Sequence, residues 1–443
     1  MNIAVVGSGI SGLSAAYSLA KDHRVVLFEA DARLGGHTNT VDIQLEGITQ
    51  PVDTGFLVYN ERTYPELIAL FKHLNIPTAA TDMSFSVSRG PHQMEWCGSN
   101  LSGLFAQKRH LVSPRFWGML YDMFRFNRQA SELAQNMLQA TSNSSLAFGH
   151  AMLDQPLDLF LEREGYGEAF AADYLLPMAA AIWSCPMKQM REFPLGTFVR
   201  FFHNHGLLQV SNRPRWFTVD GGARQYVQAI AKTLPDVRLN TPVWSVEQRA
   251  NTTGQLRLRS SAGDEWFDAV VLACHADQSL RMLQRPRPAQ AQLLASIRYQ
   301  DNRAWLHCDS RLMPRSRQAW AAWNYLSKQT RSDTSSLDQT AVSVTYWLNR
   351  LQPLAIKTPV FVSLNPLDEP KPSTCFQVID YAHPVFDLAA VRAQRQLPAI
   401  QGADGVWLAG AWTGYGFHED GLKSGLAVAR AIEQTPGALA LAA

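Results

Sequence analysis

Several features that would assign a protein to other classes are missing from this chain of 443 residues. No run of eighteen apolar residues occurs, so no segment is predicted to span a membrane. The net charge of +2 gives no argument for nucleic-acid binding. The five cysteines are scattered and form no C-x-x-C pair, which favours free thiols over a disulfide framework or a zinc site. They are Cys97, Cys185, Cys274, Cys308 and Cys375.

The sequence also lacks a P-loop, a nucleophile triad and metal-ligand spacing, so no metal site is predicted. It starts directly with an apolar run from Ile3 to Val6, which leaves no room for a signal peptide. We therefore expect a cytoplasmic protein, and contact with the inner membrane face stays open. With 46% hydrophobic and 18% charged residues the chain is globular, and it can form about two domains.

What is present is a glycine motif at the N-terminus. Gly7, Gly9 and Gly12 have the spacing G-x-G-x-x-G between the run that ends at Val6 and a predicted helix. In this motif the first glycine permits the tight turn, the second lets a pyrophosphate approach, and the third lets the helix pack closely on the strand. A second predicted strand ends at Glu29, where a carboxylate suits the two hydroxyls of an adenosine ribose. The motif predicts a dinucleotide-binding fold and leaves NAD and FAD open.

Two further segments resemble the flavin-containing amine oxidase superfamily, which includes protoporphyrinogen oxidases and carotenoid desaturases. One is Arg33-x-Gly35-Gly36-His37, and the other is Asp53-x-Gly55. The resemblance implies that the first lies under the pyrophosphate of FAD and that the second passes near the flavin ring. Arginine supplies fixed charge for phosphate, and paired glycines permit close backbone approach.

A segment from Val406 to Gly425 resembles the carboxy-terminal flavin motif of the same superfamily. A buried strand is predicted before Gly410, and a helix is predicted to begin at Asp420. The N-terminus of such a helix stabilises negative charge on a reduced flavin. Ala411 stands where many relatives have an acid, so ribitol contacts through the backbone are expected. No cysteine lies in this loop, and we expect FAD to be bound non-covalently.

The stretches at Gly7, Gly221 and Gly410 are thus predicted to converge on one FAD. Val243 is implied to lie against the adenine, and His275 is predicted to be structural. The implied FAD contacts are Gly7, Ser8, Gly9, Ser11, Gly12, Glu29, Ala30, Arg33, Gly35, Gly36, His37, Thr38, Asp53, Thr54, Gly55, Phe56, Val243, Ala273, Cys274, Gly410, Ala411, Phe417, Asp420, Gly421 and Leu422.

The implied fold is α/β, with a Rossmann-like FAD-binding domain of the glutathione reductase type and an inserted α+β substrate domain. Three parts are predicted to form the FAD-binding domain, namely residues 1–77, 214–282 and 396–443. Two parts are predicted to form the substrate domain, namely 78–213, which reads as largely helical, and 283–395.

One helical segment of the substrate domain interleaves basic and aromatic residues. The basic ones are Lys108, Arg109, Arg115, Arg125 and Arg128, and the aromatic ones are Phe105, Phe116, Trp117, Tyr121, Phe124 and Phe126. Such a segment can lie on an anionic membrane surface. The simpler alternative, which we favour at this stage, is a helix with one solvated face and one core face.

For function we expect an FAD-dependent oxidoreductase of the oxidase or desaturase type. The motifs around Asp53 and His418 also resemble a bacterial group associated with cyclopropane or methylated fatty-acid enzymes. That resemblance implies an apolar or lipid substrate, an unsaturated or modified acyl chain that loses a hydride. The alternatives are an amine oxidase acting on a polyamine or amino acid, and a non-catalytic flavoprotein that scaffolds a lipid-modifying complex. No nucleic-acid partner is expected, and the oligomeric state is not predicted.

Three residues are candidates for catalysis. His418 belongs to a dense titratable group with Glu419 and Asp420, and a histidine could carry a proton near neutral pH. Alternatively, Asp420 caps the helix and His418 orders the loop. Tyr59 and Tyr415 are candidates to line the flavin ring.

Overall fold

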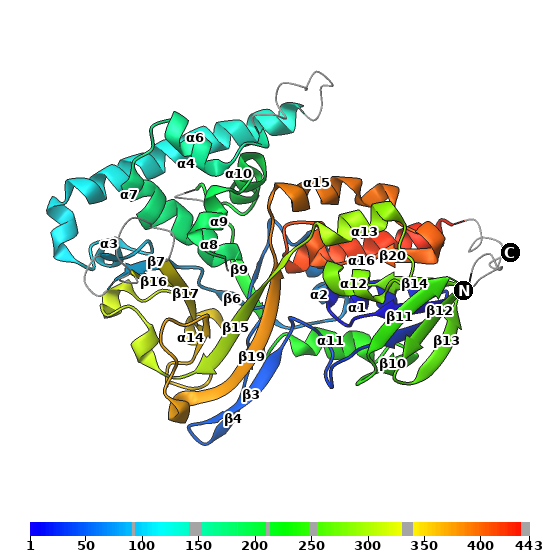
Figure 1. The fold of residues 1–443 in the computed structure, drawn as a ribbon. Coiled ribbons are helices and arrows are strands. Elements are labelled where there is room, and N and C mark those ends of the chain that lie inside the picture. The colour runs from blue at the N-terminus through cyan, green and yellow to red at the C-terminus, as the bar shows by residue number, and fades with distance from the viewer. Residues whose placement is uncertain are drawn as a thin grey trace.

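The structure is a computed structural model that describes residues 1–90, 94–140, 153–183, 185–209, 213–248, 255–329 and 340–435. Two bodies lie side by side, one around a parallel sheet and one around a larger mixed sheet covered by helices (Figure 1). No helix in these ranges is both long enough and apolar enough to cross a membrane. The mixed α/β architecture expected from the sequence is confirmed.

The parallel sheet has the strand order β10-β2-β1-β14-β20 and contains the N-terminal strand at its centre. Its strands are β1 (Asn2–Val6), β2 (Arg24–Phe28), β10 (Asp236–Arg238), β14 (Ala269–Leu272) and β20 (Val406–Leu408). The inner strands β2, β1 and β14 are almost entirely buried apolar runs, as parallel strands usually are, whereas the edge strand β10 is short and only partly buried. Three distant stretches of sequence therefore supply one sheet.

Alternate residues of the parallel strands enter two different cores. Val5 and Leu27 pack with helices α1 (Ile10–Leu19), α2 (Pro65–His73), α11 (Arg224–Ala231) and α16 (His418–Glu433). Val6 and Phe28 pack against the other layer, which is a three-stranded sheet together with helices α12 (Ala276–Met282), α13 (Pro288–Ala295) and α15 (Leu388–Gln396). That sheet consists of β11 (Val243–Gln248), β12 (Leu256–Ser260) and β13 (Gly263–Phe267). The period of two in the strands thus produces three layers.

The second body is built on a seven-stranded sheet of order β19-β15-β18-β17-β16-β7-β8. Its strands are β7 (Phe85–Arg89), β8 (Met94–Cys97), β15 (Tyr299–His307), β16 (Trp323–Gln329), β17 (Thr340–Trp347), β18 (Phe361–Leu364) and β19 (Cys375–Pro384). All neighbours are antiparallel except β16 and β7. Smaller sheets join the bodies, formed by β3 (Thr40–Leu45) and β4 (Ile48–Asp53), and by β5 (Tyr59–Asn60), β9 (Trp216–Val219) and β6 (Thr78–Thr81).

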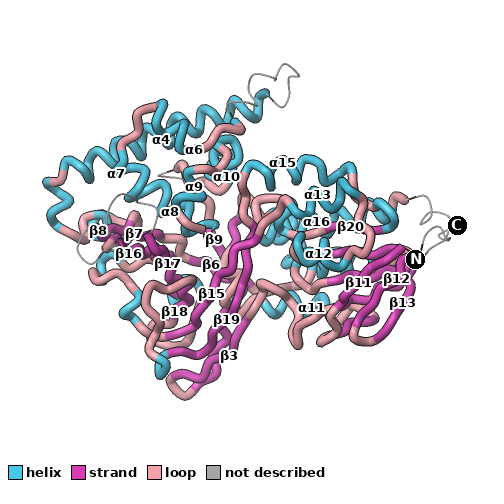
Figure 2. The backbone as a smooth tube through the Cα atoms, in the orientation of Figure 1, coloured by secondary structure: helices cyan, strands magenta, loops and turns pink. Residues whose placement is uncertain are grey.

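Helices cover one side of the mixed sheet, as the separation of cyan and magenta in Figure 2 shows. They are α3 (Leu101–Leu104), α4 (Pro114–Ala140), α6 (Leu157–Arg163), α7 (Glu168–Phe170), α8 (Leu176–Trp183), α9 (Met187–Arg191) and α10 (Leu195–Asn204), and the short α14 (Leu348–Leu351) follows β17. The segment 78–213 is therefore helical only after three strands, β6, β7 and β8. The predicted domain boundaries themselves stay predictions.

Helices α1 and α16 approach so closely that glycine is needed between them. A Cβ on Gly425 would lie 2.1 Å from Ser14 Oγ and 2.2 Å from the carbonyl oxygen of Ser11, and one on Gly421 would lie 2.8 Å from Ile10 Cγ2. Helix α16 begins at His418, two residues before the predicted start at Asp420. The close contact brings the carboxy-terminal flavin motif beside the N-terminal glycine turn.

We therefore expect Gly425→Ala to destabilise the protein by about 1–3 kcal/mol, because the new methyl group overpacks this interface. Gly118→Ala in α4 is the matched control, because no atom lies within 4 Å of a Cβ built there. An alanine in that exposed helical position should stabilise by about 0.5–1 kcal/mol. Urea unfolding measures both, and equal stability of the two variants would contradict the packing described here.

Candidate active site

The glycine turn between β1 and α1 has the geometry that the motif predicts. Gly7 has a φ of +99°, and a Cβ on Gly12 would lie 1.9 Å from the carbonyl oxygen of Gly7. Around Gly9, by contrast, a Cβ would meet nothing within 4 Å. The turn is thus closed underneath and open above Gly9, which is the side from which a pyrophosphate would approach the N-terminus of α1. Ser11 is buried in the first turn of α1, against α16.

The end of β14 lies directly beside this turn. The amide of Ala273 donates to the carbonyl of Val6 at 2.8 Å, and a Cβ on Gly7 would lie 2.9 Å from the carbonyl oxygen of Ala273. Cys274 follows, with its sulfur 3.3 Å from the Ser279 hydroxyl. Burial raises the pKa of the Cys274 thiol to about 11, so it stays protonated at neutral pH.

Glu29 stands at the end of β2, as predicted, and faces the turn. Its carboxylate accepts hydrogen bonds from the Ser8 amide at 2.8 Å, from the Ser8 hydroxyl, and from the Asp31 amide at 2.9 Å. Ala30 beside it is exposed, and Val243 is buried at the start of β11. The Thr241 amide bonds the Glu29 carbonyl at 2.8 Å, which brings this segment to the same end of the sheet.

The loop from Arg33 to Thr38 folds over the glycine turn. The amide of Gly35 donates to the carbonyl of Ser8 at 3.1 Å, and a Cβ on Gly36 would lie 3.2 Å from the Cα of Gly9. Both glycines have positive φ values, +110° and +55°. Arg33 Nη1 is buried without a hydrogen-bond partner. A buried guanidinium nitrogen with no acceptor, next to an open turn at a helix N-terminus, fits a phosphate group.

Asp53 joins three segments of the chain. Its carboxylate accepts from the Ala223 amide at 3.0 Å, from Gln352 Nε2 at 2.9 Å, and from the Thr40 hydroxyl. Burial raises the pKa of Asp53 to about 6 against the opposing effect of these hydrogen bonds. Asp53 therefore holds the N-terminus of α11 to β4. Its predicted contact with FAD stays a prediction.

The residues after Asp53 reach the loop at His37. A Cβ on Gly55 would lie 2.1 Å from the carbonyl oxygen of His37, so only glycine fits. Thr54 bonds the Asn39 carbonyl at 3.0 Å and the Tyr381 hydroxyl at 2.9 Å. Phe56 stacks on His418 with ring centroids 3.9 Å apart.

The carboxy-terminal loop is ordered by its own acids. Asp420 accepts from the amides of Tyr415 at 3.1 Å and Phe417 at 3.0 Å, and burial raises the pKa of Asp420 to about 6. The Gly410 amide donates to Ser424 Oγ at 2.9 Å, and Ala411 begins a short turn that follows. The carbonyl of Leu422 lies 3.3 Å from Ser14 Oγ, at the interface that also contains Gly421.

The contacts of His418 favour an ordering role. Its Nε2 lies 2.8 Å from the hydroxyl of Tyr226, which in turn bonds the hydroxyl of Thr38. Burial lowers the pKa of His418 to about 3, so the imidazole is neutral at physiological pH. The hydrogen bonds Thr38–Tyr226–His418 tie the loop from Arg33 to Thr38 to the start of α16.

The two tyrosine candidates are placed differently. Tyr59 is buried in the core with Tyr64, Phe71 and Phe217. Tyr415 lines a cleft of about 260 Å³ at the start of α16. The cleft is also lined by Arg62, Thr63, Tyr64, Pro65, Asn204, His205, Phe417, Glu419, Asp420 and Lys423. Catalytic roles for Tyr59, Tyr415 and His418 stay predictions.

Sequence reasoning missed a group of aromatic and imidazole rings beside the glycine turn and the loop from Arg33 to Thr38. We call this turn and loop the cradle. His37 stacks on Tyr381 at 4.8 Å and lies 5.1 Å from His383 and 6.4 Å from His275 between ring centroids. Burial and the neighbouring histidines lower the pKa of His37 well below its usual value. The signal was the alternation Tyr381-Ala-His383, because residues two apart on a strand share a face.

Two asparagines fix the tautomer of His383. The Arg303 backbone amide can only donate, so the Asn365 oxygen accepts it at 2.9 Å, and Asn365 Nδ2 donates to Asn302 Oδ1 at 2.8 Å. Asn302 Nδ2 then lies 2.9 Å from His383 Nδ1 and donates to it. His383 consequently carries its proton on Nε2. Within the described ranges no three histidines, cysteines or acids are grouped as metal ligands.

Comparisons with known proteins agree with this architecture. Residues 10–350 match the family model of flavin containing amine oxidoreductases. A Mycobacterium tuberculosis protein that bears the name flavin-containing monoamine oxidase AofH is 26% identical over 251 residues, 56% of this chain and 52% of that protein. The chain thus spans about half of the length of this curated relative.

Two solved structures share the fold over nearly the whole chain. A CLA-producing fatty acid isomerase from P. acnes is 12% identical with a TM-score of 0.65, and the match covers 97% of this chain and 98% of that one. Putrescine oxidase bound to putrescine is 16% identical with a TM-score of 0.67, and the match covers 98% and 99%. At these identities the likeness concerns the fold.

The buried titratable groups predict that acid destabilises the protein. Burial lowers the pKa of four histidines to about 3 or 4, namely His205, His307, His383 and His418. Below their usual pKa of about 6.5 the unfolded chain binds protons at these four sites that the folded protein does not bind, so stability falls as the pH falls. Asp53 and Asp420, with pKa values raised to about 6, oppose this. Their folded forms bind protons before the unfolded forms do, so their contribution to stability is lost as the pH rises through 6.

Because the four histidines outnumber the two carboxyls, we expect a net loss of about 1–3 kcal/mol per pH unit between about pH 6 and 5. Urea unfolding across this range measures it. His205→Gln, which can still donate to the Phe201 carbonyl, removes one of the four groups and should make the slope shallower. A stability that is flat or rises toward pH 5 would contradict the expectation.

Proposed function

Since the chain belongs to the flavin-containing amine oxidoreductase family and is a flavin-dependent oxidoreductase, we propose that it removes a hydride from an apolar acyl chain, with non-covalently bound FAD as the acceptor. The substrate would be an unsaturated or modified fatty acyl group. It would lose one C–H hydrogen as hydride and a second hydrogen as a proton. Dioxygen or another acceptor would take up the two electrons.

The observation that carries the proposal is that the buried carboxylates already have hydrogen-bond or ion-pair partners within the protein. Every buried carboxylate in the described part of the chain already receives hydrogen bonds or an ion pair. Asp53 receives them from Ala223, Glu95 from Ser316, Asp173 from Arg115, Asp309 from Arg311, and Glu419 from Leu67. A substrate ammonium brought into this interior would have to compete with these donors for a carboxylate, and burying an unpaired charge is costly. A neutral, apolar substrate has no such cost.

The residues of the cradle fit FAD at its adenosine and pyrophosphate end. Glu29 would bind the ribose hydroxyls, and Arg33 together with the N-terminus of α1 would bind the pyrophosphate. When bound, FAD supplies the hydride acceptor, and the protein orients the substrate and excludes water. The uncharged rings of His37, Tyr381 and His383 provide a polar but neutral surface beside it.

Amine oxidation is the second candidate. It is favoured by the mycobacterial relative's name and by the likeness to putrescine oxidase. The likeness to a fatty acid isomerase favours the acyl substrate.

We expect anaerobic mixing with a monounsaturated phospholipid or fatty acid to bleach the flavin absorbance, and putrescine or NADH to leave it unchanged. Admission of dioxygen should restore the absorbance if dioxygen is the acceptor. Acid precipitation should release the flavin into the supernatant as FAD, which tests non-covalent binding. Bleaching by amines alone would replace the acyl proposal with amine oxidation.

Arg33→Gln should weaken FAD binding by about 10- to 100-fold, because a charge-assisted hydrogen bond to phosphate is lost. Arg24→Gln is the control, since Arg24 is exposed at the opposite end of β2 from Glu29. Titration of the apoprotein with FAD, followed by flavin fluorescence, measures both. Equal affinity of the two variants would show that Arg33 does not bind the phosphates.

A further inference from the structure

One end of the helical layer exposes large apolar side chains. Trp117 is 50% exposed, Tyr121 70% and Phe124 56%, and the spacing of four and three residues puts them on one face of α4. Leu111 and Val112, 52% and 82% exposed, precede the helix at the end of a 3₁₀ turn (Lys108–Val112). We call these five residues the apolar patch. Helix α4 thus has one exposed face and one core face, as expected, and large apolar side chains lie on the exposed face.

The opposite face of α4 is the one that enters the core. Phe116, Met119, Phe126 and Ala130 are fully buried. An exposed aromatic stripe on the other face is therefore not needed to fold the helix. Contiguous exposed apolar surface on a protein marks an interaction site more often than chance.

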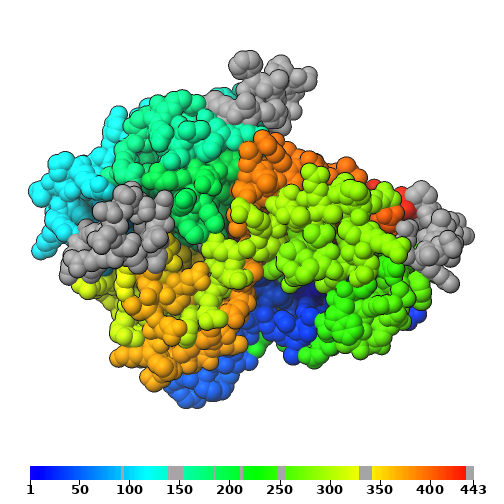
Figure 3. Space-filling view, viewed as in Figure 1, coloured from blue at the N-terminus to red at the C-terminus, as the bar shows by residue number. Residues whose placement is uncertain are grey.

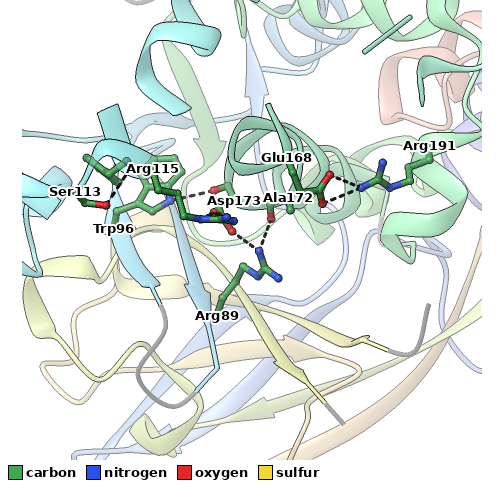
Figure 4. Close-up of polar contacts among 9 residues, drawn as sticks. Arg89, Trp96, Ser113, Arg115, Glu168, Ala172, Asp173 and Arg191 are labelled. Carbon is green, nitrogen blue, oxygen red and sulfur yellow. Dashed lines mark hydrogen bonds and ion pairs between the residues drawn. The ribbon is translucent and has the colours of Figure 1, made fainter. Parts of the chain in front are cut away.

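The apolar patch is held rigidly. Trp117 Nε1 donates to the carbonyl of Leu111 at 3.0 Å, so the turn and the helix present one surface. Arg115 in the first turn of α4 pairs at 2.7 Å with Asp173, a buried carboxylate that also pairs with Arg89 of β7 (Figure 4). Asp173 thus links the start of α4 to β7 through two arginines.

Basic residues predominate in the chain segment that carries the patch. From Ser99 to Arg128 the exposed charged residues are all cationic, namely Lys108, Arg109, Arg115 and Arg128. The one acid in that stretch, Asp122, is half-buried and bonds the Gly167 amide at 2.8 Å and Arg125 at 3.0 Å. Two exposed acids lie farther along, Glu132 in the later part of α4 and Glu168 beside Gly167, where it pairs with Arg191 at 3.2 Å. An apolar strip with several cations beside it is complementary to an anionic lipid surface, where aromatic rings enter the headgroup region and basic residues meet phosphates.

We propose that the apolar patch docks on the surface of an anionic phospholipid bilayer, so that the protein binds one leaflet without spanning it. The patch lies at the end of the molecule away from the parallel sheet, on its outer edge (Figures 1 and 3). Helix α10 packs beneath α4, and Phe201 of α10 stacks on Phe417 of the flavin loop at 4.9 Å. Only helix α10 therefore lies between α4, which would dock, and the loop around Phe417 that precedes α16. The link to catalysis, delivery of an acyl chain from the bilayer, rests on the proposed function.

The experiment measures sedimentation of the full-length protein with vesicles of phosphatidylglycerol or of phosphatidylcholine. The wild type should bind the anionic vesicles, and added salt should weaken the binding. Replacing Trp117, Tyr121 and Phe124 together by serine should lower the partition coefficient at least tenfold. Lys108→Gln with Arg128→Gln leaves the apolar surface intact and should lower it by about fivefold per residue.

Trp244→Ser is the matched control, because this tryptophan is 60% exposed on β11 at the other end of the molecule (Figure 1). Its vesicle binding should equal that of the wild type. Unchanged binding by the triple-serine variant would overturn the proposal, as would a loss of self-association in that variant together with no vesicle binding by the wild type. Vesicle binding that depends on the patch, without flavin bleaching by any lipid, would retain the docking surface and reject the acyl substrate.

Discussion

The site depends on the parallel packing of α1 and α16. Gly421 contacts Ile10 and Ser11, while Gly425 contacts Ser11 and Ser14, so positions advance in the same direction along both helices. Their N-termini therefore lie at the same edge of the parallel sheet, with the glycine turn at one and the loop around Phe417 at the other. Two positive helix ends side by side are unfavourable by themselves, and a bound anion offsets this. The same packing that unites residues far apart in sequence thus gives this edge two helix N-termini, which suits the cofactor phosphates that we propose to bind there.

The acids near this edge stabilise the protein through backbone amides. Asp53 accepts at the N-terminus of α11, Glu419 accepts from Glu66 and Leu67 at the N-terminus of α2, and Asp420 holds its own loop. These contacts give each of these carboxylates its own donors. Three histidines near this edge, His37, His383 and His418, are kept neutral by burial. Such surroundings suit the neutral, apolar substrate of the acyl proposal.

The sequence was sufficient wherever covalent geometry decides the structure. Gly7, Gly12 and Gly36 could be placed because each needs either a positive φ or the absence of a Cβ, and the spacing reveals that need. It was insufficient where distant segments meet. Asp53 was recognised, but its partner Gln352 lies 299 residues away, and Thr54 meets Tyr381 across 327 residues. No local pattern states which side chain a carboxylate will bind, so the fold was predictable and the ring cluster around His37 was not.

Helix α4 also shows that a local sequence pattern does not reveal which other segments a residue contacts. Its sequence is aromatic on two faces, and periodicity identifies an apolar face without saying whether protein covers it. In the structure the protein covers Phe116 and Phe126, whereas Trp117, Tyr121 and Phe124 are exposed. A contiguous apolar face left in water marks a place where a partner can bind. Since the exposed charges between residues 99 and 128 are all cationic, an anionic lipid surface satisfies both the apolar and the electrostatic requirement of this segment, while a purely apolar protein partner would satisfy only the first.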